Sequence, residues 1–359
     1  MLINEKTQMV KKKKKSGVGK IVTILVVLLV VVVGIVGYIA YSSTMLPNIY
    51  INNDKARFLY VYPTDNFDKV VARLDSTGNV KDIASFKKIA EYQDYPSNIV
   101  PGRYELVNQM SNVQLVNNLK KGRQAPMNLT FNNIRTKEQL CKRFDEALML
   151  TYDDIYSLLN SDDAMAKYNL NSKTSVAMFI PNTYQVYWTI SAQDLLDKMK
   201  KEYDKFWNED RIKKCADANL TQVEVSTLAA IVEEETKSVK EQPIVAGLYL
   251  NRLHKGMLLQ ADPTVKFAVG DFSIRRIRGA HLEVDSPYNT YKYEGLPPGP
   301  IRIPSMNAID AVLNYDHHDY IYMCASERFD GTHNFAKSFD DHQENAKKYH
   351  KALNRRRIR

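Results

Sequence analysis

A run of twenty residues without a charged side chain, from Ile21 to Ala40, places the strongest constraint on how this chain can fold. The run is rich in valine, leucine and isoleucine, and a helix of this length can cross the hydrocarbon core of a bilayer. A cleaved signal peptide has a shorter apolar region and a small-residue cleavage site, whereas this run ends in Ala-Tyr-Ser-Ser. The sequence therefore predicts an uncleaved transmembrane anchor over residues 21–41.

The charges that flank this run predict its orientation. Seven lysines and one glutamate give residues 1–20 a charge of +6. Positive flanks stay in the cytoplasm, so residues 1–20 are predicted to be a cytoplasmic basic tail of a single-pass plasma-membrane protein, with residues after about Ser43 outside the membrane. Four arginines near the C-terminus add +4 of the net +9, which leaves the body of the chain nearly neutral. Nucleic acid is therefore not an expected partner, because the basic residues form two tails and no patch interleaved with aromatics.

Two strand-helix units follow the apolar run. The first is an alternating strand over residues 57–62 with apolar residues at helical spacing over 67–74. The second is a strand over residues 102–107 and a helix that Ser111 can cap. Together they predict a small α/β module over residues 45–125.

The rest of the chain combines helical patterns with turn-rich segments. Residues 126–220 are mostly helical in pattern, interrupted at 178–187, where Pro181 and clustered aromatic residues predict a loop or an edge strand. Beyond them, four prolines and two glycines fix a loop over residues 295–304. A rigid loop costs little entropy to order around a ligand, although a simple connector has the same composition. The chain of 359 residues is thus predicted to be α+β, with a mixed helical and β domain at its C-terminal end.

The three cysteines indicate neither a disulfide framework nor a metal site. Cys141, Cys215 and Cys324 are widely spaced and share no metal-ligand pattern, so no metal site is predicted. Cys324 lies in an apolar run and is predicted to be a small buried hydrophobic residue. An exported protein could pair two of the three.

Three consecutive carboxylates, Glu233, Glu234 and Glu235, lie in a helix-like apolar run. At about 100° per residue, Glu235 falls near the middle of an apolar stripe, Glu234 lies at its border and Glu233 points to the far side. The stripe consists of Leu228, Ile231, Val232 and Val239. A carboxyl group on an apolar face loses hydration, which raises its pKa towards the range of a general acid. The alternative is that all three are solvated acids gathered by a helix dipole.

Six motifs occur in the order and spacing of a known family. They resemble the endolytic murein transglycosylase family, also called the MltG or YceG-like family. The similarity is dense over residues 225–345 and looser over 45–225, where the anchor and a LysM-like module match the family layout. The motifs are Ile231–Thr236, Asn251–Leu253, Leu259–Val265, Tyr288–Tyr291, Gly295–Ile301 and the pair His333 and Phe335.

This resemblance implies a lyase that cleaves peptidoglycan glycan strands between N-acetylmuramic acid and N-acetylglucosamine and leaves 1,6-anhydro ends. It implies no cofactor, a role in terminating nascent strands, and peptidoglycan synthases as companions. Residues 45–125 would be the LysM-like module, 126–220 a helical linking part and 221–359 the catalytic domain. The bilayer would be contacted through one helix.

The resemblance also assigns roles to residues. Its Ile-x-Glu-x-Glu-Thr motif places the catalytic glutamate on Glu235, which the helical-wheel argument reaches independently, and gives Glu233 a supporting or structural role. The candidates for sugar contacts lie on turns, where stabilising the turn is the alternative role for each. They are Gln260, Asp262, Tyr288, Asn289 and Tyr291. His333 is a candidate supporting residue or a structural histidine.

Two positions depart from the family pattern. Asn182 follows Pro181 where the family often has an acid, so a catalytic carboxylate is not expected there. Asn132 and Asn133 replace a common Glu-Gly pair, which puts the contribution of that segment to substrate shape in doubt.

Two other functions stay open. A hydrolytic muramidase would share the acid and would use Asp262 or Glu283 as a second carboxylate. A lytic transglycosylase manages with one, because the C6 hydroxyl of the sugar is a tethered nucleophile. The second alternative is a non-catalytic, membrane-tethered wall-binding protein in which Glu235 is inert.

Overall fold

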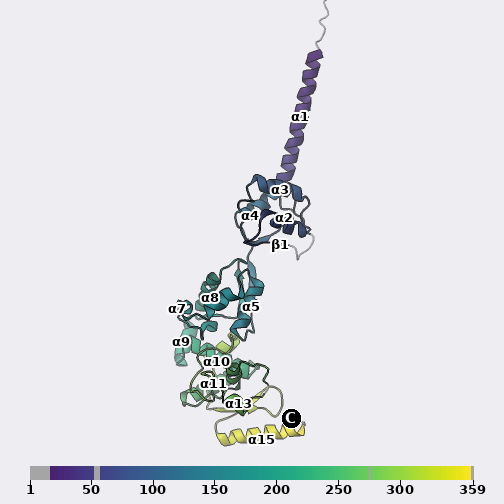
Figure 1. Ribbon diagram of the computed structural model, residues 1–359. Coiled ribbons are helices and arrows are strands. Elements are labelled where there is room, and N and C mark those ends of the chain that lie inside the picture. The colour runs from purple at the N-terminus through teal and green to yellow at the C-terminus, as the bar shows by residue number, and fades with distance from the viewer. Residues whose placement is uncertain (1–16, 52–56, 275, 357–359) are drawn as a thin grey trace, which may run out of the picture. The chain divides into compact units, whose positions relative to one another are not determined.

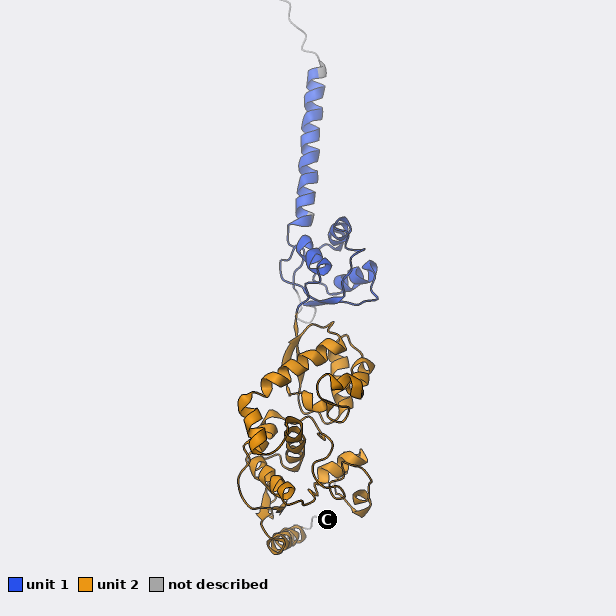
Figure 2. Cartoon of the chain, turned by 90° about the vertical axis from the view of Figure 1, so that its left-hand side faces the viewer, with its two compact units in different colours: residues 1–125 blue, residues 126–359 orange. Residues whose placement is uncertain are grey.

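The computed structural model describes residues 17–51, 57–274 and 276–356. The chain forms two compact units, unit 1 over residues 1–125 and unit 2 over 126–359 (Figure 2). Helices and strands occur in both units, which confirms the predicted α+β class. Most of the predicted basic tail at residues 1–20 lies outside the described residues.

Helix α1 (Gly17–Thr44) contains the predicted anchor (Figure 1). Its segment Gly19–Ser42 is strongly apolar, and the apolar side chains along it are exposed. An exposed surface of Val, Leu and Ile on a helix this long is suited to a lipid environment. By length and composition, α1 is compatible with a single membrane span.

The remainder of unit 1 is a small sheet with helices around it. Strands β1 and β2 pair antiparallel, with Phe58 opposite Glu105, and every second side chain of β1 is buried. Ser111 forms a capping box with Gln114 at the start of α4, as its position predicted. Helix α3 was not predicted, and it buries Phe86, Ile89 and Ala90. The elements are β1 (Phe58–Val61), α2 (Phe67–Ser76), α3 (Ile83–Tyr92), β2 (Gly102–Glu105) and α4 (Asn112–Lys120).

Unit 2 begins with a strand that was not predicted. Its segment from 126 to 220 is largely helical as expected, but β3 pairs antiparallel with β4, which lies inside the predicted loop or edge strand at 178–187. The elements of this part are β3 (Met127–Phe131), α5 (Lys137–Ala147), α6 (Tyr152–Leu159), α7 (Asp162–Ala166), the 3-10 helix η2 (Ser175–Met178), β4 (Asn182–Val186), α8 (Ala192–Phe206) and α9 (Glu209–Asp217).

The C-terminal part of unit 2 is built around one buried helix. All eight side chains from Val225 to Val232 of α10 are buried, and α10 packs against α11, α12 and α14. A helix that is apolar on all sides belongs in a core. The elements of this part are α10 (Gln222–Glu235), α11 (Gln242–His254), α12 (Asp262–Val269), α13 (Gly279–Leu282), α14 (Met306–Leu313), β5 (Tyr322–Ala325), β6 (His333–Ala336) and α15 (Phe339–Arg355).

Two predictions in this region are wrong. The apolar stripe through Val239 does not exist, because α10 ends at Glu235 and the side chain of Val239 is 58% exposed. Cys324 is not fully buried, because β5 places it at the edge of a cavity. Cys141 and Cys215 are buried, and all three thiols are free.

A close backbone approach explains a glycine inside α11. A Cβ atom built on Gly247 would lie 2.3 Å from the carbonyl oxygen of Asp316 and 2.9 Å from Nε2 of His318. The segment around Asp316 is fixed to α11, because its amide donates to the carbonyl of Pro243 at 3.1 Å. The backbone contact, and not helix propensity, selects glycine at this position.

We predict that Gly247→Ala destabilises unit 2 by roughly 1–3 kcal/mol. Alanine improves helix propensity by only about 1 kcal/mol, which does not offset pushing a backbone carbonyl away. Denaturant unfolding of the full chain in detergent, followed by tryptophan fluorescence, measures the change, because both tryptophans, Trp188 and Trp207, are buried in unit 2. The matched control is Gly279→Ala, where a Cβ would meet no atom within 4 Å. Equal stability of the two variants would contradict the steric explanation.

Candidate active site

A cavity of about 270 Å³ opens at the C-terminal end of α10. Its walls come from α10, α11, the start of α12, the turn before α14 and the β5–β6 hairpin. Among its lining residues are five of the predicted site residues, namely Glu235, Gln260, Asp262, Tyr291 and His333. The fold thus brings together residues that are almost 100 positions apart in the sequence.

Glu235 enters the cavity because it is the last residue of α10. The next residue, Thr236, has an extended conformation, and its amide still donates to the carbonyl of Val232 at 3.1 Å. The buried α10 therefore fixes the position of the Glu235 backbone. On the facing helix α11, the hydroxyl of Tyr249 donates to Oε1 of Glu235 at 2.8 Å.

Burial raises the pKa of Glu235 to about 7. The hydrogen bond from Tyr249 opposes this shift, the charge of Asp262 adds to it, and the charges of Lys266 and Arg252 oppose it. Burial also raises the pKa of Tyr249 well above its usual range, so its hydroxyl remains a donor near neutral pH. A carboxyl group with a pKa near 7 can hold a proton and release it at neutral pH, as a general acid and base requires.

Arg252 forms a rigid wall of the cavity. Its guanidinium is buried and donates to the carbonyls of Ile321 at 2.7 Å, Leu259 at 2.8 Å and Leu258 at 3.2 Å. These bonds attach α11 to β5 and to the segment before α12. Sequence reasoning assigned no role to Arg252 or Tyr249, although Arg252 lies in one of the six motifs.

Two turns form the opposite wall and are joined through Thr290. The amide of Gln260 donates to the carbonyl of Thr290 at 3.0 Å, and the hydroxyls of Thr264 and Thr290 lie 2.8 Å apart. Gln260 has a positive φ of 51°, which directs the chain into α12. The hydroxyl of Tyr291 then donates to Oδ1 of Asp262 at 2.7 Å, which holds both side chains at the cavity.

Two predicted sugar contacts lie outside this cavity. Asn289 is fully buried, and its side-chain amide donates to the carbonyls of Leu282 and Val284, both at 2.8 Å. It has the turn-stabilising role that the sequence left as an alternative. Tyr288 lines a different cavity of about 630 Å³, where its ring lies 4.7 Å from that of Phe267.

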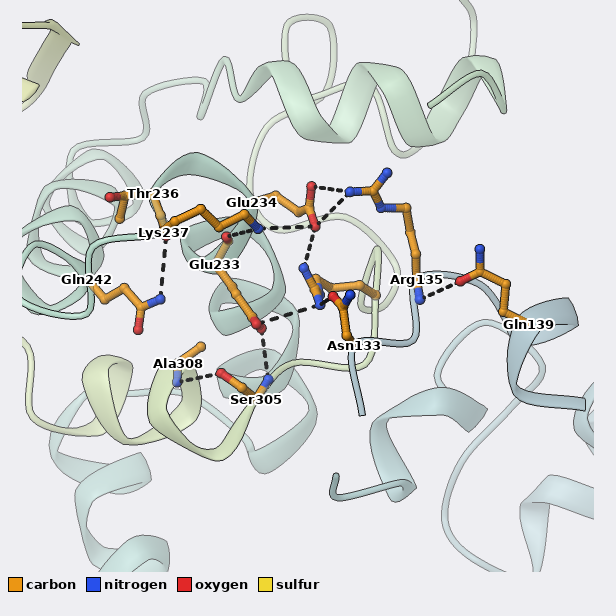
Figure 3. Close-up of polar contacts among 11 residues, drawn as sticks. Asn133, Arg135, Gln139, Glu233, Glu234, Thr236, Lys237, Gln242, Ser305 and Ala308 are labelled. Atoms are coloured by element: carbon orange, nitrogen blue, oxygen red, sulfur yellow. Dashed lines mark hydrogen bonds and ion pairs between the residues drawn. The ribbon is translucent and has the colours of Figure 1, made fainter. Parts of the chain in front are cut away.

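The other two carboxylates of the triplet do not line the cavity and belong to a polar cluster (Figure 3). Glu234 pairs with Arg302, whose side chain is 3% exposed, and with Arg135, at 2.9 Å. Burial opposes ionisation of Glu234, but the charges of Arg302, Lys237 and Arg135 outweigh it and lower its pKa. Glu233 accepts the amide hydrogen bond of Ser305 at 2.8 Å, at the start of α14.

The two departures from the family pattern have different surroundings. Asn133 has a positive φ of 50°, a conformation in which glycine is most favourable and asparagine is tolerated. Its Oδ1 accepts a hydrogen bond from Arg302 at 2.8 Å, so the side chain joins the polar cluster. Asn182 is exposed on β4 and does not line the cavity. Within the described residues, no group of three His, Cys, Asp or Glu side chains is placed to hold a metal ion.

The chain is similar to known proteins over most of its length. The sequence model of the YceG-like family matches residues 59–348. An endolytic murein transglycosylase from Streptococcus pneumoniae D39 is 27% identical over 341 residues, which cover 84% of this chain and 60% of that protein. One from Bacillus subtilis 168 is 41% identical over 123 residues, or 34% of this chain and 33% of that protein. This chain thus spans about 60% of the length of its pneumococcal relative.

A solved structure shares the architecture. The crystal structure of a yceG-like protein from Listeria monocytogenes superposes with a TM-score of 0.54 at 26% identity. The match covers 80% of this chain and 98% of that one.

We predict that Glu235 makes the stability of unit 2 depend on pH. Between about pH 4.5 and 7 the native carboxyl keeps a proton that the unfolded chain has released, so the free energy of unfolding falls as pH rises, by at most about 1.4 kcal/mol per unit. Glu235→Gln lacks this component, so its stability relative to the wild type should rise across this window and level off above pH 7. Tyr249→Phe should extend the window upwards, because the ionised form loses a donor. Parallel stability curves for wild type and Glu235→Gln would contradict the raised pKa.

We predict that Arg302→Met destabilises unit 2 by about 3–5 kcal/mol, because it leaves Glu234 half-buried without its closest partner. The matched control is Arg135→Met, which removes a more exposed partner of the same carboxylate and should cost about 1 kcal/mol or less. Tryptophan fluorescence during denaturation measures both. Similar losses in the two variants would show that burial does not set the strength of these pairs.

Proposed function

The chain belongs to the YceG-like family, and from this membership and the half-buried Glu235 we propose that it is an endolytic lytic transglycosylase of peptidoglycan. The observation that carries the proposal is the position of Glu235, held by Tyr249 inside a cavity with its pKa raised to about 7. The pneumococcal and Bacillus relatives are named for this activity. The reaction needs no cofactor.

In the proposed mechanism, Glu235 is the acid and then the base. Its protonated carboxyl gives its proton to the oxygen that links N-acetylmuramic acid to N-acetylglucosamine, and the bond to C1 breaks. The resulting carboxylate takes the proton of the C6 hydroxyl of the muramic acid as that oxygen bonds to C1. The product is a 1,6-anhydro end, and Glu235 is protonated again. The tethered hydroxyl makes a bound water molecule unnecessary.

Residues that line the cavity beside Glu235 supply the proposed contacts with the sugar. We assign contacts with sugar hydroxyls and N-acetyl groups to Gln260, Asp262 and Tyr291, which line the cavity beside Glu235. Asp262 also places a negative charge where positive charge develops on the sugar ring. Glu233 has a structural role through α14. Arg252 serves the site by fixing the wall, since its Nε and Nη1 donate to backbone carbonyls.

The proposed location of the protein in the membrane rests on helix α1 and the charges that flank it. We propose that α1 crosses the plasma membrane once, with the basic tail in the cytoplasm and both units beyond Ser43 outside it. Unit 1 would be a LysM-like module that holds the wall, and residues 126–220 and 221–359 would be the linking and catalytic parts of unit 2. Termination of nascent strands beside the peptidoglycan synthases is the corresponding cellular role.

Hydrolysis is the competing chemistry. Of the two candidate second carboxylates, Asp262 lies in the cavity, whereas Glu283 does not line it and its side chain is 81% exposed. Asp262 could activate a water molecule, as in glycosidases that use two carboxylates. The products distinguish the two reactions, because transglycosylation consumes no water.

We predict that the wild-type chain in detergent releases glycan fragments with 1,6-anhydro ends from purified peptidoglycan, and that Glu235→Gln releases none. With water enriched in oxygen-18, mass spectrometry should find no label in the new ends. The matched control Glu283→Gln should cleave like the wild type. Labelled reducing ends would establish a muramidase, and equal cleavage by wild type and Glu235→Gln would leave only a wall-binding role.

A further inference from the structure

A second buried carboxylate, Glu241, lies behind the cavity wall and faces His333. Glu241 is 8% exposed. Its Oε1 accepts the backbone amide of His333 at 2.8 Å, and its Oε2 lies 3.2 Å from Nδ1 of the same residue. The hydroxyl of Thr236 donates to Oε2 at 3.1 Å. The sequence analysis singled out His333 but not Glu241.

Both carboxylate oxygens of Glu241 accept hydrogen bonds. The backbone amide of His333 donates to Oε1 and the hydroxyl of Thr236 donates to Oε2, and the residue lies at the N-terminus of α11, where the helix dipole favours negative charge. A buried carboxylate needs such partners. Thr236 follows Glu235 directly, so the same turn that ends α10 carries the proposed acid and one partner of Glu241.

This contact determines which ring nitrogen of His333 carries the proton. Both carboxylate oxygens already accept hydrogen bonds, one from a backbone amide and one from a hydroxyl, so Nδ1 is the donor in its contact with Oε2. In the neutral ring, Nε2 then has a free lone pair. His333 lines the same cavity as Glu235, and the contacts found among the described residues use its backbone amide and Nδ1 but not Nε2.

We propose that Nε2 of His333 accepts a hydrogen bond from a hydroxyl or an amide N–H of the sugar in the cavity, and that Glu241 is the positioning residue that fixes this tautomer. The inference rests on the proposed glycan-cleaving function and extends it by two residues. It turns His333 from a supporting residue into a substrate contact. Glu241 acts only through the ring that it orients.

Glu241→Gln tests the tautomer with little change in shape. The glutamine oxygen can still accept the backbone amide of His333, while its NH₂ group faces Nδ1 and forces the ring proton onto Nε2. The acceptor offered to the sugar becomes a donor. We expect KM for glycan strands to rise roughly 10- to 100-fold, with a smaller change in kcat, because a mismatched hydrogen bond in a cavity weakens binding. In ¹⁵N NMR of the histidine-labelled full chain in detergent, the His333 signals should change from the Nδ1–H to the Nε2–H pattern.

A double-mutant comparison isolates the action through His333. His333→Ala alone should raise KM to a similar extent, and adding Glu241→Gln to it should raise KM no further. The matched control is Glu327→Gln on the β5–β6 hairpin, where the carboxylate accepts from Asn334 at 2.7 Å outside the cavity, and it should leave KM unchanged. His333→Ala also tests the sugar contact if Glu241→Gln does not fold.

Three results would overturn this inference while glycan cleavage by the wild type stands. They are an unchanged KM in Glu241→Gln after the tautomer has switched, an unchanged KM in His333→Ala, and additive effects in the double variant. A wild-type chain that cleaves no glycan would instead refute the proposed function. In that case the NMR comparison still reports whether Glu241 sets the tautomer of His333.

Discussion

The hydrogen bond between Tyr249 and Glu235 is the interaction around which the candidate site is organised. It joins the C-terminal end of α10 to the middle of α11, which packs against it, and the side chain of Tyr249 is buried while that of Glu235 is half-buried at the cavity. Burying a carboxyl group is unfavourable unless the group is neutral or accepts a hydrogen bond. Both conditions apply to Glu235, because its pKa is raised to about 7 and the hydroxyl of Tyr249 donates to it. The packing of α10 offsets the unfavourable burial of Glu235. Eight consecutive side chains of α10 are buried, so the helix cannot rotate Glu235 into solvent.

Three neighbouring glutamates show how position on a helix decides chemistry. Successive side chains are rotated by about 100°, so Glu233, Glu234 and Glu235 face different surroundings. Glu233 binds the start of α14, Glu234 is drawn into an arginine cluster that lowers its pKa, and Glu235 faces the cavity, where its pKa is raised. The arginine cluster also serves the site indirectly, because Arg302 fixes the end of α10 beside the proposed acid.

The sequence predicted local features better than the contacts between them. The capping residue Ser111 and the period of the apolar residues located several helices, and rotation along a helix selected Glu235 even though Val239 does not share its helix. It could not select Tyr249, because α11 is buried on most sides and has no polar face to indicate which side chain meets α10. The sequence left two roles open for Asn289 for a related reason. Turn residues that bind a ligand and turn residues that hold the turn have the same side chains, and only the observed bonds to Leu282 and Val284 separate them.

The polar groups around the cavity differ in whether they can exchange a proton, and this difference explains why one acid can suffice. The guanidinium of Arg252 is used by backbone carbonyls, and the phenol of Tyr249 has a pKa far above neutral. Asp262 is bonded to Tyr291 and lies towards solvent. Glu235 combines a pKa near 7 with a place inside the cavity, so in the proposed mechanism the same carboxyl group gives a proton to the leaving oxygen and then takes one from the C6 hydroxyl. In the proposed arrangement His333, oriented by Glu241, contributes a hydrogen bond to the sugar, and the proton transfers are assigned to Glu235.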